Sequence, residues 1–170
     1  GCLASPRAHP QHKADSLVSH ELVHQWFGDR MTCRDWQEMW LNEGFATYFA
    51  DLWMEHHDGP EEFAIERLRT MEAYIEASTP NLLARLKRSD SPEASKAPLE
   101  LPADMNYTKG SVVLHLLRHV LGDERFRAGI RAYVAKFRDA CVTSEDLRKS
   151  LEETSGEDLS GFFDEWVYGA

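Results

Sequence analysis

The stretch His-Glu-Leu-Val-His at residues 20 to 24 carries two histidines and a glutamate within one helical turn. On a helix, positions four apart project from the same face, so His20 and His24 can offer two imidazole nitrogens to one zinc ion. Glu21 lies roughly 100° round the helix from His20, which suits a general base that contacts a metal-bound water better than a third ligand. With 8 histidines in 170 residues, chance would produce this motif about 0.04 times, so the motif alone is suggestive but not decisive.

A further carboxylate follows at Glu43, with eighteen residues between it and His24. Its helical neighbours, which include Trp40 and Ala46, form a largely apolar stripe, where an unpaired carboxylate would cost on the order of several kcal/mol. A zinc ion shared with the two histidines would satisfy this carboxylate. The spacing therefore predicts a three-ligand zinc site.

Residues near Glu43 suggest how its helix packs, and they offer an alternative to metal binding. Gly44 would permit close approach of the helices that carry the histidines and the glutamate, at a cost of about 1 kcal/mol in helix propensity. The alternative to metal binding is a structural ion pair between Glu43 and an arginine such as Arg30 or Arg34.

The spacing also distinguishes between classes of zinc peptidase. A metzincin would need a third histidine six residues after His24, where Arg30 stands, so the class with a glutamate ligand fits. Thermolysin-like sequences carry Asp four residues after that glutamate, whereas this chain has Thr47. This departure indicates a different branch of the class.

Helices must position these residues, because the hydrophobic spacing along the chain is helical and no stretch alternates convincingly as a strand. The first three expected helices run from about Lys13 to Phe27, from about Asp35 to His57, and from Pro60 to residue 78, and the first of them ends at Gly28. Four more are expected over residues 105–121, 123–137, 143 to about 156, and 158–167, and Gly122 closes the first of these four. Four prolines interrupt the connection from about Thr79 to Asp104, which we expect to be a functional flap or a mobile segment. The expected fold class is mainly α, with residues 1–170 as a single helical domain.

Length, charge and cysteine content narrow the kinds of protein that fit. A chain of 170 residues that is 42% hydrophobic can bury the core of one domain. The net charge of -10 speaks against nucleic acid as a partner, because such a surface would repel the phosphate backbone. Three widely spaced cysteines indicate neither a disulfide framework nor a cysteine-ligated zinc site.

The sequence shows neither a membrane-spanning segment nor a signal peptide. No apolar run approaches the roughly 20 residues needed to span a bilayer, and the first residues lack the apolar core of a signal peptide. We therefore expect no membrane segment and prefer the cytoplasm, although the sequence fixes no compartment. Because the chain begins without Met, we take it to be a piece of a longer protein.

Two stretches, HELVHQWFGD at 20–29 and WLNEGFATYF at 40–49, resemble the zinc aminopeptidase family of aminopeptidase N and the leukotriene hydrolase, which is a gluzincin family. Further along, NYTKGSVVLHLLRHVLGDERF resembles the Tyr-x-Lys-Gly helix of that family, and SGEDLSGFFDEWVYG resembles the end of its catalytic domain. The resemblance covers most of residues 17–169. It implies that the chain is the helical half of a thermolysin-like zinc peptidase catalytic domain.

The same resemblance implies a role for each site residue. His20, His24 and Glu43 would bind one Zn²⁺ per chain, Glu21 would activate the water, and Tyr107 would donate a hydrogen bond to the developing oxyanion. Three protein ligands leave a fourth zinc position for water, whose pKa the ion can lower to about 7. A tyrosine hydroxyl that meets the oxyanion in the transition state is worth about 3 to 4 kcal/mol. Without the family pattern, the preferred reading of this tyrosine is a packed aromatic at a helix start.

The chain departs from the family pattern in two ways. The Gly-Ala-Met-Glu-Asn stretch, whose Glu grips the free amino terminus of the substrate, lies upstream of the zinc helix in the family and is absent here. The family also often has an acidic residue seven positions after the third ligand, where it can support a zinc histidine. Here Ala50 stands at that position, and the neighbouring Asp51 is turned by about 100° from that face.

These observations lead to one expected function and two alternatives. We expect a zinc metallopeptidase domain that hydrolyses peptide bonds by a zinc-activated water and acts as an aminopeptidase in its full-length form. Its partners would be peptide substrates and the missing N-terminal part of the full-length protein. One alternative is a non-catalytic zinc- or peptide-binding module, because the part that grips the amino terminus is missing. The other is a metal-free helical interaction domain.

The remaining histidines and aromatic residues are expected to have structural roles. His115 and His119 repeat the four-residue spacing, but no Glu follows the first and the helix is apolar, so we interpret them as packing or solvent-edge residues. His56 and His57 fall at a helix C-terminus, where positive charge suits the helix dipole. We expect the aromatic series in the core rather than in a binding cage, with the lining of the cleft left open as a role for some members. The series comprises Trp26, Phe27, Trp36, Trp40, Phe45, Phe49 and Trp53.

Overall fold

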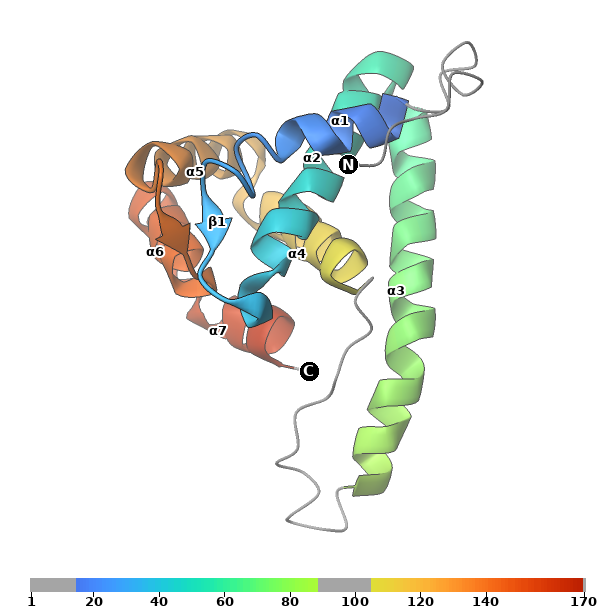
Figure 1. Ribbon diagram of the computed structural model, residues 1–170. Helices are drawn as coiled ribbons and strands as arrows, with labels where there is room; N and C mark the ends of the chain where they lie inside the picture. Colours follow the sequence, from blue (N-terminus) through green and yellow to red (C-terminus); the bar gives the residue numbers. More distant parts are fainter. Residues whose placement is uncertain (1–14, 89–104, 170) are drawn as a thin grey trace.

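The computed structural model describes residues 15–88 and 105–169 and is mainly α, as the sequence predicted (Figure 1). The helices are α1 (Asp15–Val23), α2 (Trp40–Asp58), α3 (Pro60–Arg88), α4 (Met105–Leu121), α5 (Asp123–Lys136), α6 (Ser144–Ser155) and α7 (Ser160–Phe163). A 3-10 helix, η2 (Trp36–Glu38), precedes α2, and a π-helical segment, η4 (Asp164–Tyr168), follows α7. Among these helices, none combines the length and the apolarity that crossing a membrane requires.

Helix α1 ends earlier than we predicted, at Val23 rather than near Phe27. After His24 the chain turns sharply, with Gly28 at φ 136°, and the Gly28 amide donates to the carbonyl of Met31 at 2.6 Å. A positive φ of this size strains any residue with a Cβ, so the glycine permits the reversal. The predicted start at Lys13 lies outside the described residues.

Helix α2 passes through the middle of the molecule in Figure 1 and supplies much of the core. The Asp35 side chain caps η2 by accepting from the amide of Gln37. Leu41, Phe45 and Tyr48 of α2 are 2% exposed or less, and they pack with apolar residues of α4, α5 and α6. Glu43, in the first turn of α2, is therefore carried by a helix that is anchored in the hydrophobic core.

Helix α3 continues past the point where we predicted a Pro-rich connection to begin. It includes Pro80 and ends at Arg88, so the boundary expected at Thr79 is wrong. A proline inside a helix removes one backbone hydrogen bond and disfavours the helix by about 3 kcal/mol, but it does not forbid continuation. The rest of the expected connection, residues 89–104, lies outside the described residues.

Helices α5 and α6 begin where the sequence signals predicted, whereas α7 begins at Ser160 rather than at 158. Thr143 accepts from the Asp146 amide while the Asp146 carboxylate accepts from the Thr143 amide, which completes a capping box at the start of α6. We predicted no strand, but Thr32–Cys33 (β1) pairs in parallel with Cys141–Val142 (β2). Two-residue strands are too short to show alternation, so this pairing had no signal in the sequence.

The aromatic residues are divided between core and surface. Phe27, Trp40 and Phe45 are buried as predicted, but Trp36 is 84% exposed and Trp26 47% exposed. Trp53 is also exposed. The preferred core placement is therefore wrong for these three tryptophans.

Candidate metal centre

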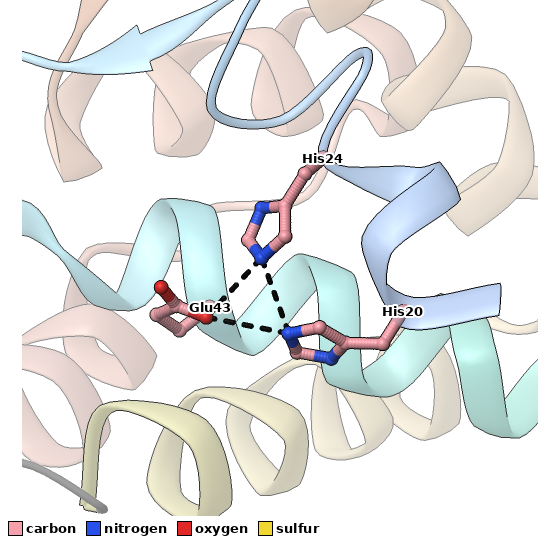
Figure 2. A group of neighbouring side chains, drawn as sticks. All are labelled: His20, His24 and Glu43. Carbon is pink, nitrogen blue, oxygen red and sulfur yellow. Dashed lines mark hydrogen bonds and ion pairs between the residues drawn. The ribbon is translucent and has the colours of Figure 1, made fainter. Parts of the chain in front are cut away.

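Helix α1 and the residue after it bring two histidines to one side. The His24 amide donates to the His20 carbonyl at 3.3 Å, so the helical turn extends through both residues. Their Nε2 atoms lie 3.1 Å apart, and both point toward the first turn of α2 (Figure 2). The four-residue spacing thus places both side chains on one side of the helix, as helix geometry predicts.

Glu43 meets these two nitrogens from the first turn of α2. Its Oε2 lies 3.4 Å from Nε2 of His20 and 3.3 Å from Nε2 of His24 (Figure 2). Within the described ranges 15–88 and 105–169, these three residues form a group that could hold a metal ion, with all three atoms within 4.8 Å of one another. Arg30 pairs with Asp139 there, and Arg34 forms no ion pair with Glu43. The alternative of an arginine partner is wrong for these residues.

The donor set and its spacing fit a zinc ion. Four ligands at about 2.0 to 2.1 Å in a tetrahedron have their atoms about 3.3 Å apart, and the three pairs observed here span 3.1 to 3.4 Å. Oε2 of Glu43 is also buried and accepts no hydrogen bond from the described residues. A buried carboxylate oxygen that faces two imidazole nitrogens is satisfied by a shared cation.

The His24 ring is held in the tautomer that a metal requires. Its Nδ1 lies 2.9 Å from the carbonyl oxygen of Phe27, and because a carbonyl can only accept, Nδ1 must carry the proton. Nε2 is then left with a free lone pair that faces the cluster. The turn at Gly28 makes room for this contact, since a Cβ there would lie 3.1 Å from Nδ1.

Electrostatics also favour the neutral form of the His20 imidazole. Burial lowers its pKa, and the neighbouring His24 lowers it further, while Glu43 and Glu21 act in the opposite direction. The net pKa lies below the ordinary value of 6.5. At neutral pH this imidazole is therefore uncharged, which is the form that a metal ligand requires.

Tyr107, in the first turn of α4, lies beside the cluster. Its ring stacks on the His20 ring with centroids 5.8 Å apart and planes 18° apart, and 41% of the residue is exposed. Burial raises the pKa of its hydroxyl, and the charges of Glu43 and Glu21 raise it further. The hydroxyl thus stays protonated at neutral pH and can donate a hydrogen bond.

Glu21 is exposed and has no part in the cluster itself. Its carboxylate is close enough to raise the pKa of both His20 and Tyr107. Of the five predicted site residues, His20, His24 and Glu43 therefore form the cluster. Tyr107 stacks on His20, and Glu21 acts on both rings through its charge.

Asp51 does not support a zinc histidine. Its carboxylate accepts from the buried guanidinium of Arg67 on α3, and Ser111 of α4 also bonds to that guanidinium. Burial raises the pKa of Asp51 to about 6, although Arg67 acts to lower it. Asp51 thus faces α3, and the role of Arg67 had no signal in the sequence because its partners lie 16 and 44 residues away.

Comparison with known proteins agrees with this geometry. The family model described as the peptidase family M1 domain matches residues 4–166. Aminopeptidase N of Lactococcus lactis subsp. lactis is 32% identical over 164 residues, which are 89% of this chain and 18% of that protein. Probable aminopeptidase 2 of Sulfurisphaera tokodaii is 35% identical over 158 residues, covering 89% of this chain and 19% of that protein.

Solved structures show the same fold. The M1 zinc metallopeptidase of Deinococcus radiodurans superposes with a TM-score of 0.66 at 29% identity, over 91% of this chain and 33% of that one. The chain thus spans about a fifth of the length of the two aminopeptidases and a third of this structure. The resemblance inferred from the HELVH and WLNEG motifs is confirmed, and the helices correspond to the helical part of the catalytic domain. The chain therefore belongs to peptidase family M1, the family of the zinc aminopeptidases.

Proposed function

We propose that this chain carries the hydrolytic centre of a zinc-dependent peptidase. In this proposal His20, His24 and Glu43 hold one zinc ion, Glu21 is the general base and Tyr107 is the hydrogen-bond donor. The observation that carries the proposal is the convergence of three ligand atoms at 3.1 to 3.4 Å. Membership of the M1 family supports it.

Glu21 and Tyr107 each have a distinct role in the proposed peptide hydrolysis. When bound, zinc supplies a Lewis acid that polarises the scissile carbonyl and makes a water molecule more acidic. The carboxylate of Glu21 accepts a proton from the attacking water and passes it to the leaving amine. The neutral hydroxyl of Tyr107 donates to the carbonyl oxygen as negative charge develops there.

The proposed substrates are peptides, and the proposed activity of the longer protein is that of an aminopeptidase. Relatives that bear the name aminopeptidase support this assignment. The grip on the free amino terminus is proposed to come from outside this chain, which has no counterpart of the Gly-Ala-Met-Glu-Asn stretch.

A non-catalytic zinc- or peptide-binding module is the second candidate. One observation favours it: α1, which carries His20, buries none of its residues. Val18 and Leu22 on this helix are each 57% exposed. Exposed apolar side chains on a ligand-bearing helix fit a chain that needs a covering partner before it can hold substrate.

One set of measurements separates these functions. Zinc content of freshly purified protein, never exposed to chelator, is measured together with hydrolysis of leucine p-nitroanilide and short peptides. A peptidase holds about one zinc per chain, and Glu21→Gln lowers the rate by about 10²- to 10⁴-fold while zinc is retained. Equal rates for Glu21→Gln and the parent would reject the proposed mechanism.

The other outcomes assign the remaining candidates. Full zinc content without hydrolysis, in a chain that gains activity when made at the length of its relatives, identifies a module that depends on the rest of the protein. Well under one zinc per chain, with no gain in stability on adding zinc, identifies a metal-free interaction domain.

A further inference from the structure

Two cavities adjoin on the surface of α2 and α5. One, of about 460 Å³, reaches from α2 and α5 to the end of α4, and the other, of about 640 Å³, follows α5 to the segment after α1. They share Phe49, Ile130 and Arg131 as lining residues. None of the three candidate metal ligands lines either cavity. We call the two cavities together the arginine groove.

The floor of the arginine groove is apolar. Phe49, Leu52 and Val134 line it and pack from the surface onto the hydrophobic core. Trp26, at the end nearer α1, keeps 47% of its surface exposed. A contiguous exposed apolar surface with a polar rim is typical of an interaction site.

The rim of the groove is basic. It contains Arg30, Arg118, Arg127, Arg131 and Arg138, and Glu55 is the carboxylate among the described lining residues. The chain as a whole has 29 acidic residues against 19 lysines and arginines. The rim is therefore positively charged although the chain as a whole is negatively charged, and its electrostatic field favours a negatively charged ligand.

Most of these arginines already have acidic partners. The ion pairs are Arg30 and Arg138 with Asp139, Arg118 with Glu55, and Arg118 and Arg127 with Asp123. Arg131 is exposed and forms no ion pair with any residue in the described part of the chain. Its guanidinium is thus an uncompensated cation at the boundary of two apolar cavities, where it can bind a carboxylate through two parallel hydrogen bonds.

We propose that the arginine groove binds a peptide segment of a partner protein that carries an acidic side chain between apolar ones. The carboxylate pairs with Arg131, and the apolar side chains enter the two cavities on either side of it. An extended peptide presents successive side chains to successive pockets, which suits two cavities joined by one cation better than a single small ligand does. The groove is then a recognition site separate from the candidate metal centre.

The test compares two labelled peptides on the complete 170-residue chain. One is fluorescein-Ser-Gly-Phe-Leu-Glu-Phe-Leu-Gly-Ser, and the other has Gln in place of Glu. Fluorescence anisotropy is measured with EDTA present, so that no peptide is cleaved. The Glu peptide binds about tenfold more tightly than the Gln peptide, as expected for one charge-assisted hydrogen-bonded pair at a partly exposed site.

Two variants assign this preference to Arg131. Arg131→Gln binds both peptides equally, while Arg125→Gln keeps the tenfold preference. Arg125 is a matched control, because it lies on the same helix and carries the same charge but pairs with Glu157 outside the groove. Equal affinity of the parent for both peptides, or equal losses in both variants, overturns the proposal.

Analytical ultracentrifugation without peptide tests whether a second copy of this chain occupies the groove. The parent is expected to be a monomer at the concentrations used for anisotropy. A dimer that dissociates on Arg131→Gln would give the groove to a second copy of this chain and would overturn the peptide assignment. Displacement of the bound Glu peptide by dodecanoate at an affinity higher than that of the peptide would instead assign the site to a fatty carboxylate.

Discussion

Gly44 and Gly110 lie against each other where α2 and α4 cross. A Cβ added to Gly44 would stand 2.6 Å from the Cα of Gly110, and one added to Gly110 would stand 2.7 Å from the Cα of Gly44. Gly44 follows Glu43, and Gly110 lies about one turn after Tyr107. This contact therefore sets the distance between Glu43, a proposed metal ligand, and Tyr107, the proposed oxyanion donor.

We had expected Gly44 to bring the glutamate helix close to the histidine helix. The close approach is instead to α4, because the partner glycine lies there. Two glycines that face each other allow backbone contact, and no larger residue fits at this distance.

Gly110→Ala is expected to destabilise the protein by about 1 to 3 kcal/mol, because the added methyl group forces two backbones apart. Urea unfolding followed by circular dichroism measures this change. Gly161→Ala is the control, since no atom lies within 4 Å of a Cβ there, and its effect should stay within about 0.5 kcal/mol. Similar stability for the two variants would contradict the role of the glycine contact.

Glu43→Gln is expected to weaken zinc binding by more than about 100-fold, because it removes a charged ligand and not merely a supporting group. Zinc content after dialysis and competition with a chromogenic chelator measure the affinity. His119→Ala, which removes an exposed histidine outside the cluster, should keep the parent affinity. Loss of zinc in both variants would place the ion elsewhere.

Removal of zinc from the parent should lower its melting temperature. A ligand present at about 100 times its dissociation constant stabilises the folded state by about 2.7 kcal/mol. Differential scanning calorimetry with and without EDTA measures the shift. Glu43→Gln should show little shift under the same conditions, and an equal shift in this variant would count against the assigned ligand.

Tyr107→Phe is expected to lower kcat by about 10²- to 10³-fold with KM little changed, because the hydroxyl acts in the transition state. Steady-state hydrolysis by the chain, or by a longer active form, measures both constants. Zinc content should equal that of the parent. A variant that lost zinc together with activity would indicate that the tyrosine supports His20 rather than the reaction.

Arg67→Met is expected to destabilise the protein by about 3 to 5 kcal/mol, because it leaves the buried carboxylate of Asp51 without its cation. Arg67 is 5% exposed and joins α2, α3 and α4. Arg69→Met is the matched control, since its ion pair with Glu66 is exposed and should contribute less than about 1 kcal/mol. Urea unfolding should separate the two, and equal losses would contradict the buried pairing.

The sequence determined the local features of this protein. Four-residue spacing placed His20 and His24 on one helical side, and the Thr143 capping box marked the start of α6, because both features depend on residues within one turn. The apolar surroundings of Glu43 predicted that it needed a cationic partner. The HELVH and WLNEG motifs were specific enough to indicate the family.

Only the tertiary structure decided which residues of distant segments contact each other. The stacking of Tyr107 on His20, the Gly44–Gly110 contact and the pairing of Asp51 with Arg67 each join separate helices, and nothing within one turn signals them. Local spacing fixes which side of a helix a residue occupies, whereas the element that meets that side is set by the packing of the whole core.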